Sequence, residues 1–329
     1  MNLTLCVSPH RVLRPFCNPT RFFAAMVALM PLLLGRASAQ TEQLFDQDAR
    51  KSYQAATNAL VSLASDDSFS GGIYKLKSDD AGSSDADIDL FKVIGEFPIG
   101  DSNLQFVPLL AITPSYLKLE QDSRESIPPA NLELVSWGIG LGTGVQMKFF
   151  DNLLQLTPRF KAEYSELDYD FGVSGVDDAL IDQIIPDVNT WSYIPSLEAL
   201  VQPEVADDGG VLLVRSKLSY VYVNASTSNS NISSFSSDSW VARNQIAYEQ
   251  PLSIFETKNN FIVRPGIGRV DLHGAARDGF EFNNFYEFSM DLLSREIASD
   301  YFQEIGLGAT YVHEQEIQGW RFGVFGSLN

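Results

Sequence analysis

Two consecutive stretches of the chain alternate between apolar and other residues for longer than the strands of ordinary globular proteins do. Between 136 and 149 the apolar positions include Trp137, Ile139, Leu141, Val145, Met147 and Phe149, and between 154 and 165 they include Leu154, Leu156, Phe160 and Tyr164. A period of two places successive side chains on opposite faces of a β-strand. Globular strands average about five or six residues, whereas a tilted strand that crosses a membrane needs roughly nine to eleven. Alternation alone would also fit a soluble sandwich, but the length favours a membrane barrel.

The same alternation recurs along the rest of the chain. It is clear at 191–199, 212–222, 240–249, 304–311 and 320–328, and weaker at 71–78, 88–99, 105–120, 259–272 and 284–294. With the first two stretches this makes about twelve strands, an even number as in bacterial single-chain barrels. After the first forty residues no run approaches the roughly 18 apolar residues of a transmembrane helix. We predict an all-β chain, a closed antiparallel transmembrane β-barrel of about twelve strands preceded by an amphipathic helix.

The lengths of the connections between these segments also alternate. The long polar ones are 78–87, 121–131, 168–188, 224–238 and 273–283, and the short ones are 100–104, 150–153, 203–210 and 256–260. Outer-membrane barrels have short periplasmic turns and long extracellular loops. We therefore expect the cell outer membrane as the location, with both termini in the periplasm, although the connection 314–319 is shorter than this rule requires.

Residues 1–39 have the three zones of a secretory signal peptide. Three arginines without any acidic residue precede the apolar run 22–34, and Ala37-Ser38-Ala39 supplies a cleavage site. Both cysteines, Cys6 and Cys17, lie in this segment, so the mature chain has no thiol for a disulfide or a zinc site. We divide the chain into a signal peptide (1–39), an N-terminal amphipathic helix that is a candidate plug of the lumen (40–70) and an outer-membrane β-barrel (71–329).

The predicted helix spans about 42–65. Phe45, Ala49, Tyr53 and Leu60 recur at three- and four-residue spacing with charged residues between them, which is the pattern of an amphipathic helix. Glycines at every second position from Gly138 to Gly144 are expected to keep the lumen face of their strand flat, so that this helix can lie against it.

Polar residues that alternate with the apolar face are predicted to face the lumen. They are Lys148, Arg159, Lys161, Glu163, Glu198, Arg215, Lys217, Arg243, Glu249, Arg264, Glu304 and Arg321.

Tryptophan and tyrosine favour membrane interfaces, and the predicted orientation places several of them at one level. This aromatic girdle comprises Trp137, Tyr164, Trp191, Tyr222, Trp240, Tyr311 and Trp320. A soluble fold has no reason to align its aromatic residues in this way.

A helix ahead of about twelve strands, the last of which ends the chain, resembles the translocator domain of autotransporters, in particular solitary autotransporter-like outer-membrane barrels that lack a passenger. The resemblance covers about residues 42–329 and rests on architecture. It implies that the helix threads the lumen and that basic side chains of the wall point toward Glu42, Asp46 and Asp48 of the helix. These basic residues are Arg159, Lys161, Arg215, Lys217, Arg243, Arg264 and Arg321. About thirty residues before the first strand are expected to leave no room for a passenger. The function it implies is a structural or surface-interaction role with a helix-occupied pore.

The charge of the chain limits its partners. It carries 42 acidic against 23 basic residues, and four of these basic residues are arginines of the predicted signal peptide. This excess of negative charge argues against nucleic acid as a partner. Acid clusters in the predicted loops, such as Asp79-Asp80 and Asp177-Asp178, suit divalent cations that bridge to lipopolysaccharide phosphates, although solvated loop charge explains them equally. The expected partners are outer-membrane lipid, lipopolysaccharide and the barrel-assembly machinery, and no cofactor is expected.

Two other functions are compatible with the sequence. Inward arginines and lysines favour a diffusion channel, or porin, for small anionic solutes. A lipid-active outer-membrane enzyme is a minority alternative, because His273 and His313 lie near the predicted outer rim but no serine is paired with either by spacing. We expect no catalytic, cofactor or metal site.

Overall fold

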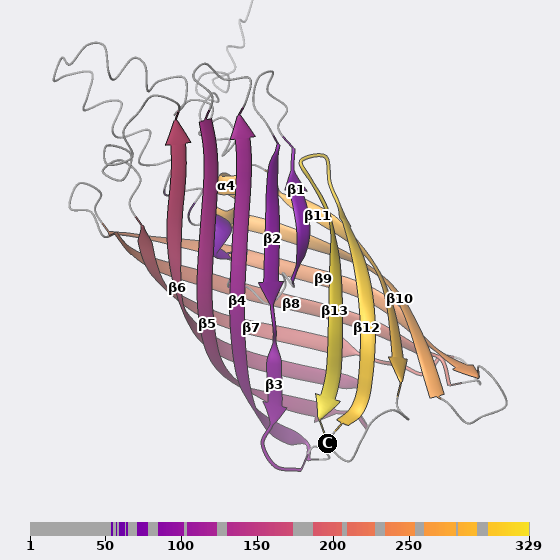
Figure 1. Cartoon of the computed structure of the whole chain (residues 1–329). Coiled ribbons are helices and arrows are strands. Elements are labelled where there is room, and N and C mark those ends of the chain that lie inside the picture. Colours follow the sequence, from indigo (N-terminus) through magenta and orange to yellow (C-terminus); the bar gives the residue numbers. More distant parts are fainter. Residues whose placement is uncertain are drawn as a thin grey trace, which may run out of the picture.

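The structure is a computed structural model, and its described part is a cylinder of β-strands (Figure 1). It describes residues 71–77, 85–101, 104–123, 130–173, 187–205, 209–227, 234–253, 260–280, 282–294 and 302–328, together with helical positions 54, 57, 59–62 and 64. The predicted signal peptide and the acidic start of the predicted helix lie outside these residues. The strands are β1 (Gly72–Leu76), β2 (Ala86–Lys92), β3 (Gly95–Pro98), β4 (Phe106–Ser123), β5 (Ala130–Phe149), β6 (Leu154–Val173), β7 (Val188–Val201), β8 (Val211–Thr227), β9 (Phe235–Ser253), β10 (Asn260–Gly274), β11 (Asn284–Ser294), β12 (Phe302–His313) and β13 (Ile317–Leu328), with helix α4 (Ala275–Phe280) between β10 and β11.

Every pairing between neighbouring strands is antiparallel, and the sheet closes on itself. From β4 to β13 each strand pairs with the next along the chain, β13 pairs with β1, β1 with β2, and β2 with β4. β2 and β3 both pair with β4, so they are two halves of one wall strand. The thirteen elements therefore make the predicted closed barrel of twelve strands.

The segment 88–99, predicted as one strand, is interrupted at Val93 and Ile94. β2 ends with Lys92 opposite Ser115, and β3 begins with Gly95 opposite Ile112. The interruption thus falls opposite Pro114, which has no amide hydrogen to donate to a continuous ladder. The alternation in the sequence continues through this point and gives no sign of the break.

The first strand covers only part of the height of its neighbours. Gly72 at the start of β1 lies opposite Arg321, and Leu76 at its end lies opposite Ile317. The rest of β13 continues to Leu328 without a described partner on the β1 side. The chain therefore joins the wall about halfway along the barrel.

The two ends of the barrel differ. At one end, named here the turn end, Phe150–Leu153 forms a tight turn in which Phe150, Asp151 and Asn152 have positive φ angles of 54°, 53° and 71°. At the other end, the loop end, α4 lies, and β4 and β6 end there (Figure 1). The connection between β12 and β13 is short there, with Glu314 N–H donating to Ile317 O at 2.7 Å.

Several strands extend beyond their predicted ends into segments predicted as loops. The segments 121–131, 168–188 and 224–238 contain the loop-end parts of β4 to β9. In these parts the alternation is inverted: Leu167 of β6 is buried in the interior, whereas Glu166 and Asp168 face outward. The prediction was wrong here because the outer face of the wall becomes polar while its backbone pairing continues.

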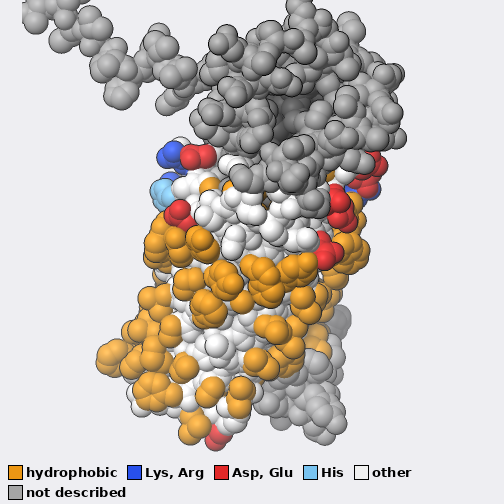
Figure 2. All heavy atoms as spheres, turned by 90° about the vertical axis from the view of Figure 1, so that its left-hand side faces the viewer, with side chains coloured by type: hydrophobic (Ala, Val, Ile, Leu, Met, Phe, Trp, Pro, Cys, Tyr) orange, Lys and Arg blue, Asp and Glu red, His pale blue; other side chains and the backbone are white. Residues whose placement is uncertain are grey.

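Below this inversion the outside of the barrel is apolar. Figure 2 shows side chains of hydrophobic residues covering a broad zone of one face, with charged side chains gathered above it and an acidic one below. On the outward faces of β5, β6 and β13, Ile139, Leu141, Phe160, Phe322 and Val324 are each between 47% and 78% exposed. An apolar belt of this kind is what lipid chains require.

Candidate functional site in the barrel lumen

The boundary between the apolar belt and the polar outer face is marked by aromatic residues. The predicted girdle residues lie there on the outward face, and cross-strand ring contacts join Tyr164 to Trp191 at 5.3 Å and Tyr311 to Trp320 at 5.0 Å between centroids. Tyr222 stacks on Tyr193 at 6.4 Å. The prediction omitted Tyr116 and Tyr220, which contact Trp137 at 4.5 Å and Trp240 at 4.8 Å. Both follow the same outward alternation, so register with the tryptophans would have identified them.

The loop-end half of the lumen is filled by an apolar core. Its wall residues come from almost every strand and include Ile88, Leu117, Leu134, Leu167, Val223, Val241 and Leu272, all at most 1% exposed. Phe280 and Phe282, after β10, stack at 5.4 Å and belong to the same core. This half therefore resembles the interior of a soluble barrel, with apolar side chains inside and polar ones outside.

The N-terminal helix, defined by its described positions 54, 57, 59–62 and 64, lies inside this core. Four consecutive residues, Ala59, Leu60, Val61 and Ser62, are each at most 5% exposed. Four consecutive residues point in every direction around a helix, so this turn is enclosed on all sides. Ser62 Oγ donates to Ser239 Oγ of β9 at 3.4 Å, which fixes the helix to the wall.

Toward the turn end the lumen becomes ionic, and most of the predicted lumen-facing residues meet there in pairs. Glu287 joins Arg243 at 2.8 Å and Arg321 at 3.0 Å. Arg264 pairs with Glu249 and, at 3.9 Å, with Asp291. On the facing wall Lys161 pairs with Glu163 at 3.2 Å.

A second chain of ion pairs begins at β3. Arg159 contacts Glu96 at 2.8 Å and Glu198 at 3.6 Å, and Glu198 also contacts Arg215 at 3.8 Å. Of the other predicted residues, Lys217 is buried on the same inward face, Lys148 is half-buried near the turn end, and Glu304 lies in β12 opposite Ser327, with its side chain outside what the structure describes.

The partners of these inward cations come from the wall. Sequence reasoning missed Glu96, Glu287 and Asp291 because they lie in the weakest predicted strands. The acids expected as partners, Glu42, Asp46 and Asp48, lie outside the described residues.

Side chains of the neighbouring strands lie close to the glycine stripe of β5. A Cβ added at Gly138 would lie 2.5 Å from Ser115 Oγ and 3.0 Å from Glu163 Oε1, and one added at Gly144 would lie 2.9 Å from Arg159 Cγ. The glycines thus leave room for side chains of β4 and β6 that cross the lumen face. Most of the helix expected against this face lies outside the described residues, so that expectation stays a prediction.

The two histidines lie apart at the loop end. His313 stacks on Tyr311 at 5.9 Å, and His273 is exposed opposite Trp240. Within the described ranges, no three His, Cys, Asp or Glu side chains gather as a metal site would require. The described residues also contain no helix long and apolar enough to cross a membrane.

This wall, with its apolar belt and internal helix, agrees with a family comparison. Residues 74–325 match the model of the solitary outer membrane autotransporter beta-barrel domain. The chain belongs to this family. It is accordingly an autotransporter-type β-barrel of the outer membrane.

Solved structures show the same fold. The translocator domain of the autotransporter NalP from Neisseria meningitidis is 14% identical, with a TM-score of 0.53 over 78% of this chain and 85% of that one. The transport unit of the autotransporter AIDA-I from Escherichia coli is 12% identical, with a TM-score of 0.54 over 83% and 96%. No curated protein sequence matches the chain.

Proposed function

We propose that the protein is a closed, non-conducting and non-enzymatic outer-membrane barrel with a structural or surface-interaction role. The observation that carries this proposal is the continuous apolar core around the N-terminal helix in the loop-end half of the lumen. A water-filled pore needs a polar lining along its whole length. An apolar core packed to the density of a protein interior leaves no path for hydrated ions.

The proposed orientation places the loop end outside the cell and both termini in the periplasm. Its support is the difference between the two ends, since long connections and a polar outer wall suit the cell surface. Above the aromatic residues the outward face carries Glu120, Glu133, Glu166 and Asp168. Divalent cations could join these carboxylates to lipopolysaccharide phosphates, which is the contact with lipid that we propose.

A diffusion channel is the second candidate, and inward cations are the observation that favours it. The ion pairs described above oppose it, because Arg159, Lys161, Arg243, Arg264 and Arg321 are each paired with a carboxylate. Paired charges offer a passing anion little net attraction.

Conductance in planar bilayers distinguishes the two candidates. We expect little current from the chain that begins at Gln40 and large current after deletion of Gln40–Ser65. A finer pair of variants is Val61→Asp, which places a carboxylate at a position 1% exposed, and Asn224→Asp, which places one on the outward face. Only Val61→Asp should open the barrel, because only it puts a charge in the core.

Steady, anion-selective current from the intact chain would contradict the proposal and establish a porin. If neither the deletion nor Val61→Asp conducts, the wall residues alone close the lumen and the helix is not needed to close it.

A further inference from the structure

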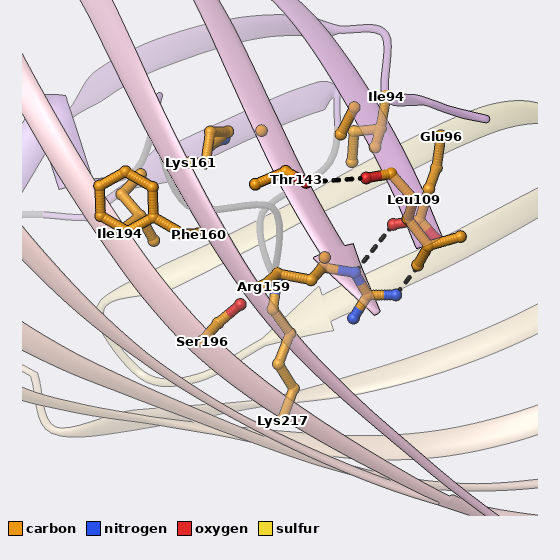
Figure 3. A pocket seen from close by; sticks show the side chains of 13 residues that line it. Ile94, Glu96, Leu109, Thr143, Arg159, Phe160, Lys161, Ile194, Ser196 and Lys217 are labelled. Carbon is orange, nitrogen blue, oxygen red and sulfur yellow. Dashed lines mark hydrogen bonds and ion pairs between the residues drawn. The ribbon is translucent and has the colours of Figure 1, made fainter. Parts of the chain in front are cut away.

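A small cavity opens in the ionic half of the lumen, between β3 and β8. Its empty volume, which includes open solvent at its mouth, is about 430 Å³. Three cationic side chains line it, Arg159, Lys161 and Lys217, together with the hydroxyl group of Ser196 (Figure 3). The strand register explains this convergence. Arg159 of β6 lies opposite Ser196 of β7, and Lys217 of β8 lies opposite Glu198, which is the next inward residue after Ser196 on β7.

Two of the three cations have carboxylate partners, and the third has none among the described residues. Arg159 is held by Glu96 and Glu198, and Lys161 by Glu163. Lys217 makes no ion pair or hydrogen bond with any residue that the structure describes, although it is only 9% exposed. Its position opposite Glu198 would allow a pair, but Glu198 contacts Arg159 and Arg215 instead.

A buried ammonium group without a counter-charge is costly, so such a group usually has a partner or a function. The neighbouring wall repeats this deficit of acceptors. The Ser219 hydroxyl, opposite Ser196, is fully buried without a hydrogen-bond partner, and Nε of Arg215 is also buried and unsatisfied. Polar groups at three positions of β8, Arg215, Lys217 and Ser219, therefore have an atom without a hydrogen-bond partner among the described residues of this part of the lumen.

We propose that this cavity binds an anionic oxygen group, a carboxylate or a phosphate carried by a small water-soluble molecule. Lys217 provides the charge, Arg159 a guanidinium edge, and Ser196 a hydroxyl donor. Charge-assisted hydrogen bonds of this kind are short and strong. The molecule enters from the turn end, because the apolar core fills the loop-end half of the described lumen.

The site goes beyond the proposed function and is independent of it. A closed barrel can bind a ligand in a blind cavity open to one side. The cavity is small, so it accepts the anionic group itself and leaves the rest of the molecule in the wider lumen.

The test is calorimetric titration of inorganic phosphate, and separately of acetate, into the folded barrel at low ionic strength. Lys217→Met keeps a long unbranched side chain and removes the ammonium group, and the affinity should fall about tenfold or more. The matched control is Lys75→Met, a 44% exposed lysine paired with Asp85 at the loop end, and it should leave the affinity unchanged. Binding of either anion with this dependence supports the site, and the preferred anion identifies the chemical class.

A second measurement, the unfolding temperature, shows whether Lys217→Met has lost affinity because it folds poorly. Without added anion, Lys217→Met should unfold at the same temperature as the unaltered chain or higher, because an uncompensated buried charge has been removed. Glu198→Gln should bind phosphate several-fold more tightly, since it removes a negative charge from beside Lys217, Arg159 and Arg215. Equal phosphate affinity in the unaltered chain and Lys217→Met, or a lower unfolding temperature of Lys217→Met in the absence of anion, would overturn the proposal.

Discussion

Thr57 Oγ1 of the N-terminal helix lies 2.8 Å from the hydroxyl oxygen of Tyr169, which is 112 residues later in β6. Thr57 is fully buried, and Tyr169 packs against the apolar core. The contact joins the helix in the lumen to the loop-end part of the wall. Tyr169 lies on the loop-end side of the aromatic girdle, where the interior of the barrel is apolar.

Removal of this hydrogen bond should loosen the helix without unfolding the barrel. We expect Thr57→Val and Tyr169→Phe each to reduce the free energy of unfolding by about 1 kcal/mol, the usual net value of one such bond. The double variant should lose little more than one single variant, because both remove the same contact. Urea unfolding in lipid vesicles measures all three, and fully additive losses would show that the residues are not coupled.

Two leucines on opposite faces of β5, one inside the barrel and one outside, should differ in how much stability is lost when each is truncated. Leu134→Ala in the apolar core should cost about 2–5 kcal/mol, because it leaves a cavity. Leu141→Ala, seven residues later on the outward face and 59% exposed, should cost less, since lipid chains can fill the space. Equal losses in vesicle unfolding would contradict the assignment of the two faces.

Glu287 is the central acid of the ionic layer. It is 2% exposed and contacts both Arg243 and Arg321, so Glu287→Gln leaves two buried cations uncompensated. We expect a loss of about 3–5 kcal/mol. The control is Glu133→Gln at the loop end, where the 42% exposed Glu133 pairs with Lys118 and the expected loss is below about 1 kcal/mol. A small loss for Glu287→Gln would mean that water reaches the pair.

Asp168 predicts a pH dependence of stability at the loop end. Burial, Asp187 and Glu166 raise the pKa of Asp168 above its ordinary value. A raised pKa in the folded state means that its contribution to stability is present at low pH and is lost as the pH rises through the folded-state value. Asp168→Asn should therefore raise the urea midpoint at about pH 7 and leave it nearly unchanged at about pH 3. A gain of the same size at both pH values would contradict this cause.

The strands that cross the belt could be predicted because lipid outside and polar groups inside impose a long alternation, as from Trp137 to Phe149. The loop-end extensions could not, since at Leu167 the apolar residue moves to the inside and the strand resembles a polar loop in sequence. Tyr116 and Tyr220 were predictable, because they follow the outward alternation and lie beside predicted tryptophans.

The lumen was predictable in composition but not in its contacts. Alternation identified Arg243 and Arg321 as inward residues, yet their common partner Glu287 lies on β11, and only the closed register brings the three together. The short length of β1 depends on its pairing with β13, and the break at Val93 depends on the opposite residue, Pro114. Neither partner lies in the segment of sequence that forms the feature, so these details could not be predicted locally.

The enclosure of the helix in the loop-end core is tested most directly by thiol labelling, because the chain from Gln40 onward contains no cysteine. Ala59 is 1% exposed on the helix, and Ser226 is exposed on the outward face. In vesicles, a membrane-impermeant maleimide should label Ser226→Cys rapidly and Ala59→Cys at least about a hundredfold more slowly, because labelling in the core requires local opening. Labelling of Ala59→Cys at the rate of Ser226→Cys would contradict the enclosed helix and with it the closed barrel.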